Sequence, residues 1–582
     1  MDKKKGLCKR FRKKFLGASA LSIFNLLLQD TEGANYYSNG AAATNAATNW
    51  VDSATNGNSY AVAPSINDTL FFNGNHTITI RGASAPYTAA GTGNVFKIAI
   101  NNPYTGAISV GDTASYTISN ITTTNSGTIT LSYGSAGSID LGANLLTGNV
   151  SFSGRNGTLS LSSGTISGTI NGGASNFGIL SLSGTPSVTG AIGPTTRLAA
   201  VNLANGTNFI QNSNLASTQV NMNGNSNLTT NGVLGMGTVS INSGTLTINN
   251  STIGVGGGST NIKFLDDGLV NSTNTNFNIK NITTSSAGTG NIKLENTVTT
   301  FFSNVGTSTL PIKTFAWDTQ TLTIPGSAAV YANTIDGAAG SSLLITATSG
   351  VLLSGNIGPN TKISLSNGSV ILSISENSVC TATIDGSGSN QGILNITPGA
   401  GKTVALLSGI GQTKKLSSFT MDIGTLNIGT SVTSATTSFV GDGSISLGAN
   451  TLTSDIDFGG KNGTISIGAL GVISGTVDNS VSVSGSVLIS GSGATISGNI
   501  GGTNQIASID FGGNFNTSLS GSTINVANIT ANSNNTGTLS LLSANGTTFT
   551  GSAGSANTSL NTVNWTSGKT LTLGSGNTSA SI

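Results

Sequence analysis

The stretch GSIDLGANLLTGNVSFSGRNGTLSL at residues 137–161 recurs without a gap as GSISLGANTLTSDIDFGGKNGTISI at residues 443–467. In both copies apolar residues alternate with Ser, Thr, Asn or Asp, which is the period of a β-strand with one buried face. Gly and Asn separate the short runs, and both residues tolerate the positive φ that tight turns require. No window of helical length after residue 28 has an apolar period of 3.6 residues. The sequence therefore predicts an all-β chain.

A second unit recurs four times, and its copies extend over about 169–207, 334–369, 383–425 and 476–516. The copies begin TINGGASNFGILSL, TIDGAAGSSLLITA, TIDGSGSNQGILNI and TVDNSVSVSGSVLI. They end GAIGPTTRLAAVNL, GNIGPNTKISLSNG, SGIGQTKKLSSFTM and GNIGGTNQIASIDF. A further pair of similar segments is FAWDTQTLTI (315–324) and VNWTSGKTLTL (563–573). Such lengths are typical of solenoid repeats, which bury their apolar residues only by stacking.

We therefore predict that residues 35–582 form a right-handed parallel β-helix, a solenoid of irregular repeats of about 20–43 residues. Strands of successive coils would pair about 4.8 Å apart, with Val, Ile and Leu stacked inside. A series of β-sandwich domains is the rival architecture. It would require clearer breaks and more aromatic residues than the 5% present.

The composition excludes several classes of protein. Only 7% of the 582 residues are charged, against about 25% in an average soluble domain. Disordered chains are usually more charged and less apolar than this one, which is 36% hydrophobic with 81 Gly. Two cysteines exclude a disulfide scaffold, and lone Cys380 fits an exported chain that keeps an unpaired thiol buried. So biased a composition also disfavours most ordinary enzymes.

The first 34 residues differ from the rest. Eight of the 22 basic residues lie within residues 1–14, and the uncharged run FLGASALSIFNLLL follows at 15–28. This layout predicts a signal peptide over residues 1–34, with a short helix and cleavage near Ala34. A signal anchor or an interfacial helix is the alternative. Without these residues the net charge would be about −3, so the pI of 8.4 reflects the leader and does not indicate nucleic-acid binding.

The repeat motifs support a family resemblance. The motifs are TIDG or TINGG, then GILxI, then the Ile-Gly ending, which is best seen in ISGNIGGTNQIASIDFGGN (496–514). They resemble the passenger repeats of the rickettsial surface-cell-antigen autotransporters, especially their outer membrane protein A type. The resemblance implies an exported β-helical passenger, displayed on the bacterial surface, that adheres to a host-cell surface protein or glycan and acts in entry. Family members are carried out by a C-terminal membrane β-barrel. The final residues, LTLGSGNTSASI, lack the alternating aromatic-flanked strands of a barrel, so we expect this translocator to be missing from the chain.

Few residues have the pattern of a catalytic or metal site. His76 is the only histidine, no G-x-S-x-G elbow is present, and one His with one mature Cys cannot build a zinc shell. We predict that His76 is a surface residue on a strand, and we assign no catalytic residue, metal or cofactor. The closest acidic groupings are Asp266 with Asp267, and Asp455 with Asp457. Alternation places the second pair on one strand face, where two carboxylates could act on a glycan, but the duplicated segment has uncharged residues there.

The basic residues and the Thr-x-Thr pairs give still weaker evidence for a binding site. The residues at one position of the four repeat endings are Arg197, Lys362, Lys415 and Gln505. They could form a spaced basic ladder for anionic glycans, but Gln505 breaks the series, and we favour solvated turn charges. The Thr-x-Thr pairs, which could resemble an ice-binding face, do not recur at one coil spacing; they include Thr77 and Thr79, Thr128 and Thr130, and Thr570 and Thr572.

Three functions follow from the sequence. The favoured one is a structural and adhesive surface passenger that is not an enzyme. The second is a polysaccharide-acting β-helix enzyme that would use Asp455 and Asp457. The third is a non-functional remnant of a split autotransporter gene. The sequence names neither the receptor nor the residues that contact it.

Overall fold

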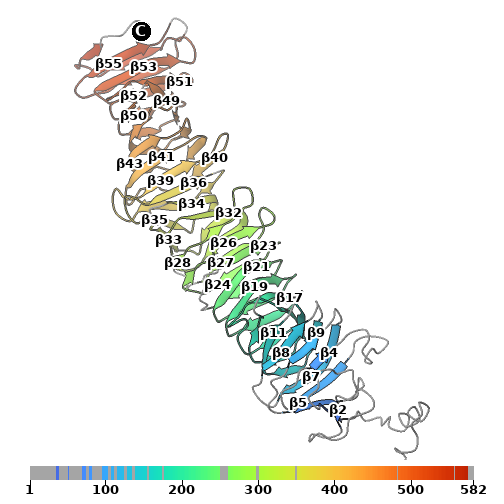
Figure 1. Cartoon of the computed structure of the whole chain (residues 1–582). Coiled ribbons are helices and arrows are strands. Elements are labelled where there is room, and N and C mark those ends of the chain that lie inside the picture. Colours follow the sequence, from blue (N-terminus) through green and yellow to red (C-terminus); the bar gives the residue numbers. More distant parts are fainter. Residues whose placement is uncertain are drawn as a thin grey trace, which may run out of the picture. The chain divides into compact units, whose positions relative to one another are not determined.

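The computed structural model describes residues 138–573, apart from 154–155, 174–175, 250–259, 296–299, 348–349, 376, 482 and 556–557, and the backbone of eight strands between residues 35 and 133 (Figure 1). The chain divides into two compact units, Met1–Gln219 and Val220–Ile582. Every regular element in the described residues is a β-strand. The predicted signal helix, its cleavage site and His76 lie outside the described residues.

The unit Met1–Gln219 is a stack of short parallel strands. Its strands are β1 (Asn35–Ser38), β2 (Trp50–Val51), β3 (Thr69–Asn73), β4 (Ile78–Ile80), β5 (Val95–Asn101), β6 (Ala107–Val110), β7 (Ser115–Thr123), β8 (Thr128–Tyr133), β9 (Ser138–Asp140), β10 (Leu145–Thr147), β11 (Asn149–Ser153), β12 (Thr158–Ser162), β13 (Thr165–Ser167), β14 (Ile170–Asn171), β15 (Ile179–Ser183), β16 (Ser187–Val188), β17 (Leu198–Leu203) and β18 (Asn208–Gln211). Thr158 pairs with Ser138 below it and with Ile179 above it, so one coil is about 20 residues long. Only the pair β1–β2 is antiparallel among the strand pairs that the structure describes here.

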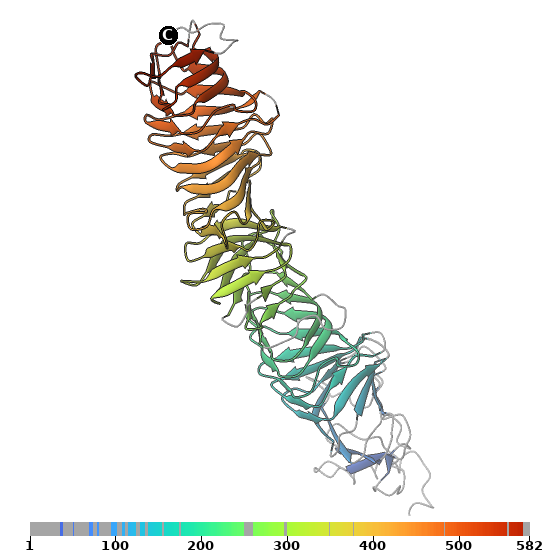
Figure 2. The same ribbon diagram turned by 90° about the vertical axis from the view of Figure 1, so that its left-hand side faces the viewer.

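The unit Val220–Ile582 repeats the same arrangement (Figure 2). Strand β19 (Leu215–Met222) contains the division between the units. The strands that follow are β20 (Asn227–Thr230), β21 (Leu234–Ile241), β22 (Thr245–Ile248), β23 (Asn261–Phe264), β24 (Leu269–Ser272), β25 (Asn276–Phe277), β26 (Asn281–Thr284), β27 (Asn291–Leu294), β28 (Thr300–Phe301), β29 (Asn304–Val305), β30 (Ile312–Trp317), β31 (Thr321–Ile324), β32 (Ala328–Gly337), β33 (Ser342–Ile345), β34 (Val351–Ile357), β35 (Lys362–Leu365), β36 (Ile371–Ser375), β37 (Val379–Cys380) and β38 (Thr383–Gly386).

The remaining strands of this unit are β39 (Ile393–Thr397), β40 (Thr403–Leu406), β41 (Leu416–Met421), β42 (Thr425–Ile428), β43 (Val432–Phe439), β44 (Ser444–Ser446), β45 (Thr451–Asp457), β46 (Thr464–Ile467), β47 (Val472–Ser474), β48 (Val477–Asp478), β49 (Ser484–Ile489), β50 (Ala494–Ile496), β51 (Ile506–Phe511), β52 (Asn516–Leu519), β53 (Thr523–Ala531), β54 (Thr538–Leu541), β55 (Thr547–Ala553), β56 (Thr562–Trp565) and β57 (Leu571–Leu573). One continuous series of parallel pairs runs β22, β24, β27, β30, β32 and β34. The predicted all-β parallel solenoid is confirmed, and the β-sandwich alternative is excluded for the described residues.

Ladders of identical or similar apolar residues form the core. One ladder in the second unit runs Leu246, Val270, Ile292, Phe315 and Ile335, each opposite the next in register and each almost completely buried. Ser, Thr, Asn and charged residues occupy most of the alternate positions and face outward, as the period of two predicts. Stacking coils therefore buries apolar side chains that one coil alone would leave exposed.

The duplicated segments share one turn. Gly142 and Gly448 take φ of 56° and 54°. In each copy an Asn two residues later donates both its backbone N–H and its side-chain amide to the carbonyl of a Leu: Asn144 to Leu141 at 3.0 and 2.7 Å, and Asn450 to Leu447 at 3.0 and 2.9 Å. The same residues thus build the same corner in both segments.

Glycines opposite aromatic rings form a second recurring contact. A Cβ added to Gly290, which has φ of +85°, would lie 2.3 Å from the ring of Phe264 in the preceding coil. Gly485, with φ of +74°, stands in the same relation to Phe458, at 2.1 Å. Because the ring fills the space of a side chain, these positions accept glycine alone without displacing the core. Gly290 directly precedes β27.

Candidate functional site

The ion pairs of the described residues all lie in the second unit, on the outward side of β24, β27 and β30. These strands are in parallel register, with Leu269 opposite Asn291 and Asn291 opposite Thr314. The alternate residues Ile292 and Leu294 are buried, so the polar residues of β27 face outward. We call this surface the charged band; its members are Asp266, Asp267, Asn291, Lys293, Glu295, Lys313 and Asp318.

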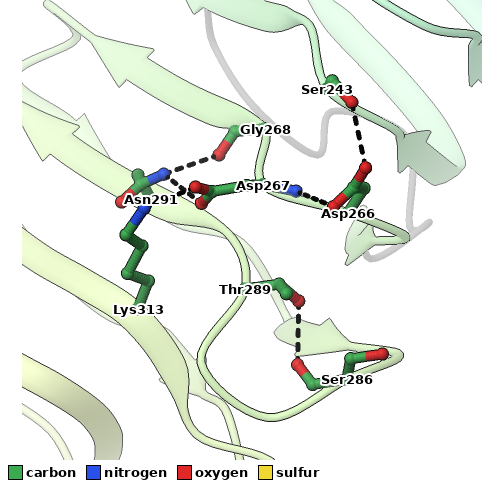
Figure 3. Close-up of polar contacts among 8 residues, drawn as sticks. All are labelled: Ser243, Asp266, Asp267, Gly268, Ser286, Thr289, Asn291 and Lys313. Atoms are coloured by element: carbon green, nitrogen blue, oxygen red, sulfur yellow. Dashed lines mark hydrogen bonds and ion pairs between the residues drawn. The ribbon is translucent and has the colours of Figure 1, made fainter.

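One half of the charged band is centred on Asp267 (Figure 3). Its carboxylate pairs with the ammonium of Lys313 and accepts a hydrogen bond of 2.8 Å from Nδ2 of Asn291. Its backbone N–H donates to Oδ1 of Asp266, whose Oδ2 accepts a hydrogen bond from Ser243. The hydrogen bond from Lys313 lowers the pKa of Asp267 below its ordinary value, against the opposing effect of burial. Asp267 therefore stays ionised and holds Lys313 and Asn291 on adjacent coils.

The other half places two carboxylates beside one ammonium. Nζ of Lys293 lies 3.0 Å from Glu295 and 3.4 Å from Asp318. Glu295 and Asp318 each follow a residue of the register pair Leu294 and Trp317, so stacking brings them side by side. Burial and the neighbouring Glu295 raise the pKa of Asp318. Burial also acts to raise the pKa of Glu295, but hydrogen bonds from Lys293 and Asp318 outweigh it and the pKa is lowered.

The charged band remains open to solvent. The side chains of Lys293 and Lys313 are 47% and 51% exposed, and that of Asp267 is 41% exposed. Exposed ion pairs of this kind contribute about 0–1 kcal/mol each to folding, so the band is not explained by stability alone. Its chemistry suits non-covalent contact with a polar surface. Among the described residues no group of three or more His, Cys, Asp or Glu could hold a metal ion.

Sequence reasoning found only part of this site. It singled out Asp266 and Asp267, which do belong to the charged band. It missed Glu295, Asp318 and both lysines. Lys293 and Glu295 are two residues apart on one coil, but only the register brings Asp318 to Lys293 and Lys313 to Asp267. The available signal was charge density: eight charged residues occur within 263–318 of a chain that is 7% charged.

The other acidic pair serves the turns between coils. Oδ1 of Asp455 accepts hydrogen bonds from the backbone N and Oγ1 of Thr476, at 2.9 and 3.0 Å. Asn149, its equivalent in the duplicated segment, binds Thr169 in the same way at 2.8 and 2.9 Å. Asp457 accepts from the backbone N–H groups of Gly459 and Ser480, at 2.8 and 2.9 Å. Both carboxylates therefore hold successive coils together, and the uncharged amide of Asn149 makes the contacts of Asp455 in the other copy.

In each of the four repeats, the third residue of the opening motif (TING, TIDG or TVDN) hydrogen-bonds to the loop in the ending of the same repeat. Asn171 accepts the N–H of Thr195 at 3.0 Å, Asp385 that of Thr413 at 3.1 Å, and Asp478 that of Thr503 at 3.0 Å. Asp336 binds the side chains of Asn360 and Thr361 instead. In every copy the Gly of the Ile-Gly pair also donates its N–H to the residue before the cap, for example Gly411 to Ile384 at 2.7 Å. The repeat motif thus specifies hydrogen bonds that join one coil to the next.

The remaining candidates are placed as follows. Lys362 begins β35 and is exposed, whereas Arg197, Lys415 and Gln505 are half-buried and each precedes the first residue of a strand. Cys380 is fully buried, and burial raises its pKa to about 12. Thr572 lies in β57 and Thr570 directly precedes that strand. Thr128 and Thr130 lie in β8 and Thr79 lies in β4, while Thr77 is outside the described residues.

No family model, curated protein or solved structure matches this chain. No helix in the described residues is long and apolar enough to cross a membrane.

Proposed function

We propose that this chain is an exported surface protein of the autotransporter-passenger type, in which a β-solenoid scaffold presents the charged band to a host-cell surface. One observation carries the proposal: the ion pairs of the described residues are concentrated on one outward face of a solenoid whose other outward positions are mostly Ser, Thr and Asn. The basic N-terminal segment and the resemblance of the repeats to rickettsial passengers support export and adhesion.

The charges of the band favour a protein partner over a polyanionic glycan. Four carboxylates belong to the band, and each of its two lysines is already engaged with at least one of them. A polyanion would be repelled by Asp266, Asp267, Glu295 and Asp318, whereas a protein surface of mixed charge can meet both signs. Arg197, Lys362 and Lys415 lie in separate repeats and do not add to the band.

Surface display is tested on producing cells. An antibody to residues 383–425 is applied to intact cells and to permeabilised cells, and external protease is added in parallel. The proposal expects antibody signal on intact cells and loss of the protein to external protease. Signal only after permeabilisation, with the protein untouched by protease, would rule out adhesion by this chain.

Adhesion through the charged band is tested with purified protein on host cells. The variant Lys293→Gln with Asp318→Asn leaves the net charge unchanged, and Lys414→Gln with Asp422→Asn is the matched control away from the band. We expect the first variant to lose binding at least tenfold and the control to bind as the parent does. Equal binding by both variants would remove the band from the proposed function.

A further inference from the structure

The ends of β27 and β30 place two carboxylates beside a single ammonium group. Glu295 and Asp318 directly follow the register pair Leu294 and Trp317, so they lie on adjacent coils about 4.8 Å apart. Nζ of Lys293 is 3.0 Å from Glu295 and 3.4 Å from Asp318, and it supplies one positive charge for two negative ones. When both carboxylates are ionised, the cluster therefore has a surplus negative charge, and like charges at this distance oppose each other's ionisation.

The neighbouring coils do not compensate this surplus. The ion pairs of Glu295 and Asp318 within the described residues are those with Lys293. On the preceding coil, β24 places the uncharged Asn271 opposite Lys293. On the following coil, β32 contributes the carboxylate Asp336, and the residues 338–341 after it are uncharged. The charged groups around Asp318 are thus two carboxylates and one ammonium.

The carboxyl groups of the band respond unequally to this arrangement. Burial and the neighbouring Glu295 raise the pKa of Asp318. Burial also acts to raise the pKa of Glu295, but hydrogen bonds from Lys293 and Asp318 outweigh it, and the pKa is lowered. The hydrogen bond from Lys313 lowers the pKa of Asp267. As the pH falls, Asp318 therefore takes up a proton before Glu295 and Asp267 do.

We propose that Asp318 is a proton-sensitive switch of the charged band, whose protonation weakens the contact with the partner and releases it in acidic solution. The protonated carboxyl donates its O–H to Glu295, which stays ionised and paired with Lys293. The band then loses one of its four negative charges while the coils stay stacked. The release of a partner rests on the proposed function, whereas the titration of Asp318 does not.

The titration is measured on the full chain by carbon-13 NMR of the side-chain carboxyl groups, from pH 7 to pH 3. The signal that is absent from Asp318→Asn identifies Asp318. We expect it to titrate at a higher pH than a free aspartate. Glu295→Gln should move this titration to lower pH, because it removes the repelling carboxylate and leaves Lys293 to Asp318 alone. Lys293→Gln should move it to higher pH, because the ammonium is lost.

The switch is overturned if Asp318 titrates as a free aspartate does. It is also overturned if Glu295→Gln leaves the titration of Asp318 unchanged, because the carboxylate on the adjacent coil would then have no effect on it.

Release is measured as the binding of purified protein to host cells at pH values above and below the measured midpoint of Asp318. The parent should bind several-fold more weakly below the midpoint, whereas Asp318→Asn should bind weakly on both sides of it. The control Lys414→Gln with Asp422→Asn should keep the pH dependence of the parent. An equal change in the binding of the parent and of Asp318→Asn across the midpoint would overturn the switch.

Failure of the proposed function gives a different result. In that case Lys293→Gln with Asp318→Asn binds host cells at pH 7 as the parent does, which rejects adhesion through the band and release with it. The NMR titration needs no host cell, so a shifted titration with unchanged binding separates the two failures.

Discussion

Substituting Gly290 with alanine tests the packing of glycine against the aromatic ring of the preceding coil. Gly290 has φ of +85°, and its added Cβ would lie 2.3 Å from the ring of Phe264. Two costs add: about 1 kcal/mol for placing a Cβ in the left-handed region, and about 1–3 kcal/mol for overpacking a filled core. We expect Gly290→Ala to lower the free energy of unfolding by about 2–4 kcal/mol.

A matched control separates the two costs. Gly340 has φ of +83°, and a Cβ there would meet nothing within 4 Å. Gly340→Ala should therefore lower stability by about 1 kcal/mol, which is the backbone cost alone. The difference between the two variants measures the contact with Phe264.

The assay is urea unfolding followed by circular dichroism, with hydrogen exchange of β27 as a local measure, since a stack of coils need not unfold in one step. In a double-mutant cycle with Phe264→Ala, the cost of Gly290→Ala should fall toward that of Gly340→Ala. If Gly290→Ala and Gly340→Ala destabilise the protein equally, the ring does not occupy the position described, and the reasoning fails.

Three further predictions concern single contacts. Burial acts to raise the pKa of Asp478, but hydrogen bonds from Thr503 outweigh it and the pKa is lowered. The contribution of Asp478 to the free energy of unfolding is therefore present above the unfolded pKa of about 3.9 and is lost as the pH falls through the lower folded value. Asp478→Ala should cost about 1–3 kcal/mol at pH 7, and urea unfolding of parent and variant should converge in acid; a pH-independent difference would contradict this. In a Cys8→Ser variant, Cys380 should not react with a thiol reagent at pH 8 until urea unfolds the chain, because it is buried and burial raises its pKa to about 12; stoichiometric labelling of the native protein would refute this. Lys313→Gln should cost less than about 1 kcal/mol in low salt and almost nothing in 1 M salt, because Lys313 and Asp267 are half-exposed; a larger or salt-independent loss would contradict a surface ion pair.

The alternation of residues and the duplications were sufficient to predict the fold. Asn144 and Asn450 build the same corner because the corner is local, and local geometry follows from local sequence. The charged band could not be predicted in the same way. Asn227 pairs with Thr245 and Thr245 with Leu269, so one coil is 18 residues long and the next 24. With coils of unequal length, residue numbers do not reveal which side chains stack.

The interpretation of Asp455 and Asp457 shows a second limit of sequence patterns. Alternation placed both carboxylates beside each other on one outward face, as in a catalytic pair. In the structure they accept backbone N–H groups of the next coil, which no pattern within one strand reports. The equivalent Asn149, which makes the same contacts with Thr169, was the better guide to the role of Asp455.

Disulfide cross-linking across successive coils tests the solenoid most directly. Ser373 on β36 lies opposite Asn395 on β39, and Asn395 lies opposite Thr420 on β41. In a chain whose native cysteines are replaced by serine, Ser373→Cys with Asn395→Cys should form a disulfide, because adjacent strands are about 4.8 Å apart. Ser373→Cys with Thr420→Cys spans two coils and should stay reduced. A disulfide in the second pair and none in the first would contradict the stacking of coils on which the fold and the charged band depend.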